Sequence, residues 1–241
     1  FKQVIFTASW QLQAEEEDRL RQNLRRNYQD FMVNTLGLQM AAMSETGIGL
    51  MTYGTEYYRD FVKSSRTDYN ANGTIAEKRI QCPVGDDANY DLFGIYLQDE
   101  ITMLDFLTIT LGARYTHAWL DANKVEDPIT GDRIKVSDNW GQLTGNFRFS
   151  AQLEKHWRIF GGISQGFRTP NLSDLTRFDS AKTNEIETPV RDLDPENFLQ
   201  YEIGLKANYE EFYLQGNYYY TQVFNMIIRY PTGRVINGQN E

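Results

Sequence analysis

The stretch LQYEIGLKANY, Leu199 to Tyr209, decides the fold because its side chains alternate strictly in polarity. A period of two residues indicates a β-strand with one apolar face and one polar face. A half-buried strand of a soluble protein would alternate in the same way, so this stretch alone leaves open what its apolar face contacts. The apolar positions are Leu199, Tyr201, Ile203, Leu205, Ala207 and Tyr209, and Gln200, Glu202, Gly204, Lys206 and Asn208 lie between them.

The same alternation recurs along the chain, and short connections take turns with long ones. This arrangement predicts an antiparallel, up-and-down meander of about nine or ten strands whose tight turns all lie at one end. We expect strands at residues 3–14, 28–43, 91–101, 107–116, 142–153, 157–168, 199–209 and 212–228, a further strand that ends near Val62, and another that begins near Val235. The polar segments at 15–27, 63–89, 121–139 and 169–196 are expected to be long connections.

The composition narrows the class of protein. The net charge of -9 argues against a nucleic-acid-binding surface, which would be basic. No run of 18 apolar residues is present, so the sequence predicts no transmembrane helix. Outer-membrane barrels have short periplasmic turns, long outer loops and strands that are only half apolar. We therefore predict an all-β, antiparallel transmembrane β-barrel, with a soluble β-barrel that binds a small apolar ligand as the alternative.

The chain begins at Phe1 inside a strand pattern and has no initiating Met. We expect residues 1–241 to be one partial transmembrane barrel domain taken from a longer protein. Cys82 is the only cysteine and falls in an expected loop. It is either a plain free thiol or the partner of a cysteine outside this excerpt.

Catalytic and metal-binding patterns are weak. Residues 162–166 match the GxSxG motif of a hydrolase nucleophile, but that motif needs a helix after it and a histidine downstream, and no histidine follows His156. The other histidine, His117, has no ligand-type spacing to His156 or to a cysteine. The sequence therefore predicts no enzyme, no metal site and no cofactor.

Two groups of residues are candidates for function. Arg168, Thr169, Pro170 and Asn171 lie where a strand emerges on the long-loop side, so we expect them near a ligand; a structural corner is the alternative. The other group consists of charged residues on the polar faces of their strands. Inside a barrel these residues would form an ionic network facing the lumen: Glu100, Arg114, Arg148, Glu202 and Lys206.

Four segments resemble the TonB-dependent receptors of the Gram-negative outer membrane, and they occur in that family's order. The hairpin GIYLQDEITMLDFLTITLGARYTH (Gly94–His117) is similar to the family's repeated hairpin, and MTYGTEYYRD (Met51–Asp60) resembles a strand before it. GISQGFRTPNLSDL (Gly162–Leu175) and LDPENFLQYEIGLKANY (Leu193–Tyr209) resemble two later segments. Singly these matches are loose, but together they cover much of the chain.

The resemblance implies a barrel of 22 strands plugged by an amino-terminal domain and located in the bacterial outer membrane. It implies uptake of an iron complex, of siderophore or haem type, or of a similar nutrient. The implied partners are the TonB energy-transducing complex, reached through the plug, outer-membrane lipid and an extracellular nutrient ligand. FRTP followed by NLSDL is similar to the haem and haemoglobin branch, yet no histidine lies between Arg168 and Asp194 to ligate haem. A plug-less channel or an adhesin-like barrel is the runner-up.

Overall fold

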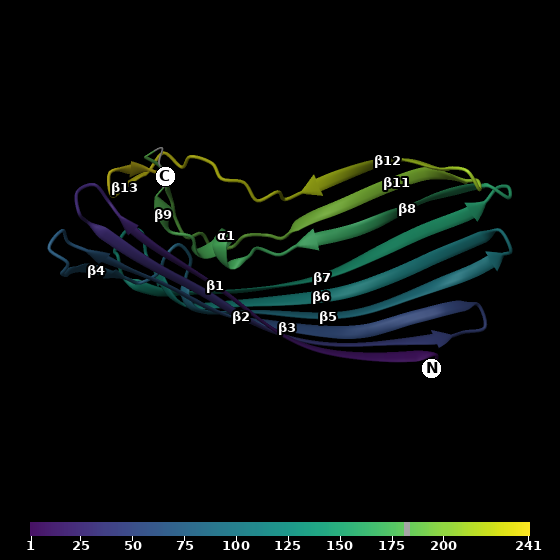
Figure 1. The fold of residues 1–241 in the computed structure, drawn as a ribbon, viewed down its shortest axis with the longest axis horizontal. Helices are drawn as coiled ribbons and strands as arrows, with labels where there is room; N and C mark the ends of the chain where they lie inside the picture. The colour runs from purple at the N-terminus through teal and green to yellow at the C-terminus, as the bar shows by residue number, and fades with distance from the viewer. Residues whose placement is uncertain (181–183) are drawn as a thin grey trace.

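The computed structural model describes residues 1–180 and 184–241. Within them, ten strands form one antiparallel sheet that curves into a trough (Figure 1). Its order is β1-β2-β3-β5-β6-β7-β8-β11-β12, and β4 pairs with the outer part of β3. These strands are β1 (Gln3–Leu20), β2 (Arg26–Glu45), β3 (Gly49–Tyr69), β4 (Ile75–Arg79), β5 (Asp86–Leu104), β6 (Leu107–Glu126), β7 (Arg133–Gln152), β8 (Trp157–Arg168), β11 (Glu196–Asn208) and β12 (Tyr213–Phe224).

The tight turns lie together at one end of the trough, beside the amino terminus (Figure 1). They join β2 to β3, β5 to β6, β7 to β8 and β11 to β12, as the alternation of connections predicts. The longer connections and the short elements lie at the opposite end. These elements are α1 (Leu172–Thr176), β9 (Asp179–Ser180), β10 (Ile186–Glu187), β13 (Val235–Ile236) and β14 (Gln239–Asn240). Among the described residues, no helix has the length and apolar character needed to cross a membrane.

Three of the expected long connections are wrong in their extent, because the strands continue well into them. β1 and β2 stay paired from Gln3 to Leu20, and β6 and β7 stay paired as far as Glu126. β3 likewise continues to Tyr69. The backbone ladder does not depend on side-chain polarity, whereas alternation fades where both faces of a strand carry polar groups. Polar extensions of strands therefore read as loops in the sequence.

The end of the chain also differs from expectation. β12 ends at Phe224, short of residue 228, and no strand of the large sheet begins near Val235 among the described residues. Val235–Ile236 instead pairs with Gln239–Asn240 in a separate hairpin. Ile236 packs with Phe178 and Ile186, so its burial comes from the connection between β8 and β11. Ile236 is thereby covered without a barrel strand, whereas Val235 stays 65% exposed.

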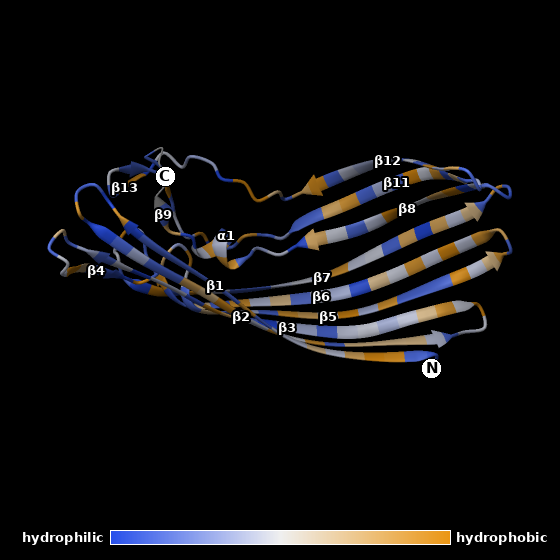
Figure 2. Cartoon of the chain, in the orientation of Figure 1, coloured by the Kyte–Doolittle hydropathy of each residue, from blue (hydrophilic) through white to orange (hydrophobic). Residues whose placement is uncertain are grey.

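The two faces of the sheet differ as the alternation predicts. Apolar side chains point from the convex face in the half of the sheet near the turns, and they remain exposed: Leu143 is 66% exposed and Ile203 is 52% exposed. Figure 2 shows these apolar positions alternating with hydrophilic ones along the strands. This large exposed apolar face is therefore suited to contact with lipid.

The concave face carries the main core, at the end away from the turns. Leu120 of β6 and Val136 of β7 are buried there against Leu175 of α1. Pairing between β7 and β8 covers only residues 146–152 and 158–164, so the two strands separate beyond that point. The helix α1, which follows β8, packs onto β6 and β7 beside this separation (Figure 1).

Candidate functional site

Charged residues line the concave face in the half near the turns. Glu100, Arg148 and Glu202 occupy one row of the sheet, because the register links Glu100 to Arg148 through Thr110 and Arg148 to Glu202 through Gly162. These side chains border a hollow of about 440 Å³. The five residues expected on the polar face all lie on this concave face, since Arg114 and Lys206 are each four residues along the strand from a member of the row.

The five residues predicted to form an ionic network do not pair with one another in the structure. Among the ion pairs of residues 1–180 and 184–241, none joins two of the five predicted residues. Arg114 instead forms an ion pair with Glu56 of β3 and donates from Nε to Thr116 Oγ1 at 2.9 Å. Sequence reasoning missed Glu56, because 58 residues separate it from Arg114.

Two other predicted members, Glu202 and Lys206, have uncharged partners. Glu202 Oε1 accepts a hydrogen bond from Asn217 Nδ2 at 3.0 Å. Lys206 Nζ lies 4.8 Å from the centre of the Phe160 ring. That ring covers Gly204, where an added Cβ would collide with it. The wall is thus a mixed polar and aromatic surface.

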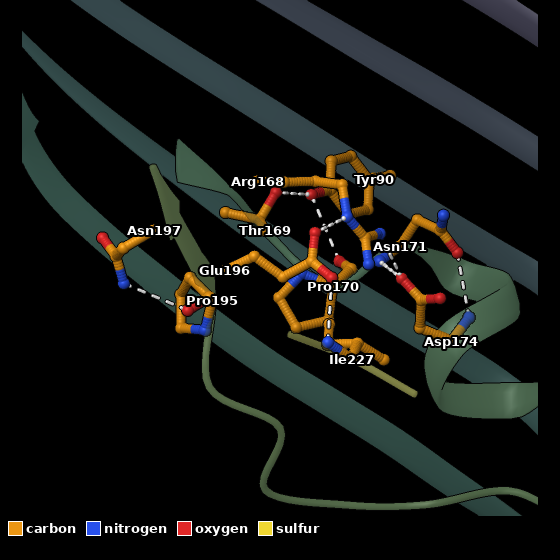
Figure 3. A network of polar contacts seen from close by, with 10 residues as sticks. All are labelled: Tyr90, Arg168, Thr169, Pro170, Asn171, Asp174, Pro195, Glu196, Asn197 and Ile227. Carbon is orange, nitrogen blue, oxygen red and sulfur yellow. Dashed lines mark hydrogen bonds and ion pairs between the residues drawn. The ribbon is translucent and has the colours of Figure 1, made fainter. Parts of the chain in front are cut away.

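Arg168 is the centre of the second candidate group (Figure 3). Its Nε donates to Glu196 Oε2 at 2.7 Å, and its Nη1 donates to Asp174 Oδ2 at 2.7 Å. Glu196 Oε1 in turn accepts a hydrogen bond from the backbone N–H of Ile227 at 2.8 Å. One guanidinium therefore links the end of β8 with α1, the start of β11 and the segment after β12.

The remaining members of this group fix the start of α1. Asn171 is the N-cap: its Oδ1 accepts from the Asp174 backbone N–H at 2.9 Å, and Asp174 Oδ2 accepts from the Asn171 backbone N–H at 2.9 Å. The N-x-x-D spacing is a capping signal that the sequence carries. The Thr169 hydroxyl hydrogen-bonds Tyr90 at 2.5 Å, and Pro170 is fully buried. All four predicted residues lie together and form a corner; contact with a ligand stays a prediction.

Residues between β4 and β5 make a second set of contacts with α1. Gln81 Oε1 accepts from the Glu126 backbone N–H at 3.0 Å, and its amide donates to the Thr176 carbonyl at 2.5 Å. The Gly85 backbone N–H donates to Thr176 Oγ1 at 2.8 Å. Cys82 is buried beside these groups, and this burial raises the pKa of its thiol.

An ionic cluster holds β4 against β3 outside the membrane-sized part of the sheet. Asp68 accepts from Arg66 Nε at 2.8 Å and from Arg79 Nε at 3.1 Å. Burial alone would raise the pKa of Asp68, but the two arginines outweigh it and hold that pKa below its usual value. The Asp68 carboxylate is therefore ionised when the hairpin is folded at neutral pH.

Neither histidine belongs to a ligand set. His117 lies on the convex face, with Nδ1 3.0 Å from the Tyr115 hydroxyl and its ring 4.2 Å from that of Trp119. His156 is in the turn between β7 and β8, where its ring stacks on Tyr209 at 4.3 Å. Among the described residues, no group of three or more His, Cys, Asp or Glu side chains could hold a metal ion.

An antiparallel sheet with an exposed apolar convex face, a polar concave face and tight turns at one end defines the wall of an outer-membrane β-barrel. The family model described as "TonB dependent receptor-like, beta-barrel" matches residues 5–240. The chain therefore belongs to the TonB-dependent receptors, whose barrels lie in the bacterial outer membrane. The resemblance seen in the sequence is thus confirmed.

Solved structures agree with this fold. The copper transporter OprC superposes with a TM-score of 0.75 at 15% identity, over 91% of this chain and 36% of OprC. The ferric yersiniabactin uptake receptor FyuA from Yersinia pestis gives 0.64 at 16% identity, over 92% and 33%. The Serratia marcescens hemophore receptor HasR gives 0.63 at 14%, over 91% and 40%. The chain thus spans between a third and two fifths of these structures. No curated protein sequence matches it.

Proposed function

We propose that this chain forms part of the wall of a receptor that takes up an iron complex, of siderophore or haem type, or a similar nutrient. One observation carries the proposal: α1, which follows β8, is docked onto the concave face where the sheet opens outwards. A nutrient arriving there would meet α1 rather than an unobstructed pore. The protein would then act as a transporter and not as an enzyme.

The kinds of cargo named for similar structures support this class of nutrient. Their names refer to copper, to heme with its hemophore, to ferric yersiniabactin and to ferric citrate. At 14–16% identity these structures share the fold alone, so the cargo of this chain is our proposal. All four of these names nevertheless refer to a metal or a metal complex.

Each candidate group has a role in this proposal. Asn171 is exposed at the start of α1, so we place it beside the incoming nutrient, while Arg168, Thr169 and Pro170 hold it there. The lumen-facing group of Glu100, Arg114, Arg148, Glu202 and Lys206 would contact a plug. The TonB complex would act through that plug, and outer-membrane lipid would cover the convex face.

Growth assays test the proposal with the full-length gene. A deletion strain would be supplied with single iron sources or with cobalamin, in backgrounds with and without TonB. We expect restored growth on one iron complex only when TonB is present. Equal restoration without TonB would favour a plug-less channel, and no restoration on any iron source would contradict iron uptake.

Variants of Arg168 test the positioning role within the same assay. Arg168→Ala leaves Asp174 and Glu196 without their shared donor, which should weaken uptake roughly tenfold or more. Arg168→Lys keeps the charge and should recover part of the loss. Wild-type uptake by Arg168→Ala, with the same protein level in the membrane, would contradict the role.

A further inference from the structure

One row of residues across the sheet marks the level at which the strands leave the membrane on the outer side. Register joins Leu36, Arg59, Asp91 and Trp119 across β2, β3, β5 and β6. Arg59 is ten residues along β3 from Gly49, where that strand leaves its tight turn. A tilted strand needs about 9–11 residues to cross the hydrocarbon layer. Trp119, which is 40% exposed on the convex face, is a residue type enriched at such an interface.

Arg59 is incompletely satisfied in this row. Asp91 lies 3.6 Å from its Nε, and the Asp91 carboxylate also accepts a hydrogen bond from Tyr57. The guanidinium lies 5.1 Å from the centre of the Phe61 ring. Arg59 Nε has no hydrogen-bond partner although the atom is buried. The Arg59 side chain is nevertheless 40% exposed, so a loosely paired cation stands beside exposed apolar side chains at the membrane surface.

Further cations lie outward of Arg59 on the same face. Lys63 is four residues further along β3, and Arg133 and Lys135 are exposed on β7. Lys135 forms an ion pair with Asp121 at 2.8 Å. Among the described residues, neither Lys63 nor Arg133 forms an ion pair with a carboxylate. Positive charge thus collects here in a chain whose net charge is -9.

The spacing of this basic patch indicates more than one anionic group in its ligand. Lys63 and Lys135 lie on β3 and β7, three strand intervals apart in the sheet order, which is about 14 Å at the usual strand spacing. Arg59 lies four residues below Lys63, which is about 13 Å along the strand. On the β2 side the patch ends at Asp30, whose carboxylate repels anions.

We propose that Arg59, Lys63, Arg133 and Lys135 bind the headgroup of an outer-leaflet lipid that carries two phosphate groups. Charge complementarity selects the phosphates. The height of the patch selects a lipid over a free anion, because the apolar convex face begins directly below Arg59 and would receive the acyl chains. Leu36 and Ile95, both about half exposed, are part of that apolar face. This inference goes beyond nutrient uptake.

The test uses the full-length protein in detergent and cardiolipin, a lipid with two phosphates, as the probe. Retained lipid is measured by native mass spectrometry for the wild type and for the double variant K63A/K135A. We expect roughly 10- to 30-fold weaker cardiolipin retention in the variant. The matched control K2A/K155A removes two exposed lysines at the opposite end of the strands and should change retention less than about threefold.

Other measurements separate the lipid from related ligands. Phosphatidylcholine, which is zwitterionic, should bind both the wild type and the variant weakly. Sodium pyrophosphate should fail to displace cardiolipin at equal concentration. A gel shift on boiling checks that each variant is a folded barrel. Unchanged cardiolipin retention in folded K63A/K135A, an equal loss in K2A/K155A, or full displacement by pyrophosphate would overturn the proposal.

Discussion

Leu175 tests whether the segment between β8 and β11 is held on the concave face by apolar burial. Its side chain is 0% exposed and packs in the cluster with Leu120 and Val125 of β6. Truncation of a fully buried leucine to alanine costs about 2–5 kcal/mol, as lost burial plus the cavity that remains. Because the wall is held by its own ladder, we expect this cost to fall on local opening of the segment. Amide exchange over residues 172–178 should then accelerate by about 30- to 4000-fold in Leu175→Ala.

Hydrogen exchange followed by mass spectrometry on the full-length protein in detergent measures this directly. Peptides from β6 and β7 near the turns report on the wall and should be unchanged. Leu143→Ala is the matched control, since it removes the same atoms from a side chain that is 66% exposed on the convex face. A change of less than about threefold over residues 172–178, or one equal to that of the control, would refute the reasoning.

Two further predictions concern charge and packing. The pKa of Asp68 is below its unfolded value near 3.9, so its carboxylate stabilises the β3–β4 hairpin above about pH 4, and this is lost as pH falls through the folded pKa. Asp68→Asn should therefore speed exchange over residues 66–79 at pH 6, and this effect should shrink as pH falls below about 4; an effect that grows as pH falls would contradict the pairing. Gly204→Ala should displace Phe160 and destabilise the barrel by about 1–3 kcal/mol, lowering its gel-shift temperature. Gly166→Ala, where the nearest atom is 3.8 Å away, should leave that temperature unchanged, and equal shifts would refute the contact.

Much of the wall could be predicted from the sequence, because alternation is a local property of a strand. Tyr201, Ile203 and Leu205 are exposed on the convex face as their period implies, and Glu202 and Lys206 lie opposite them. The tight turns were equally readable. The strand ends were not, since polar residues continue a ladder as readily as apolar ones once both faces leave the membrane.

The candidate site, too, could be predicted from the sequence only in part. Its corner at residues 168–171 was visible as a strand end, and the Asn171 cap had a local signal. The partners of Arg168 were hidden, since Glu196 is 28 residues away and the connection between them could have run anywhere. Which loop covers which part of the concave face depends on packing, not on periodicity.

By itself, therefore, the sequence determined a membrane wall with one apolar and one polar face, because a period of two residues fixes which way each side chain points. Only the tertiary structure decided which residues meet across that wall. Arg114 reaches Glu56 and not Glu100 because the register of three neighbouring strands sets which side chains come within reach. The docking of Leu175 on β6 was decided in the same way, by contacts that no local pattern encodes.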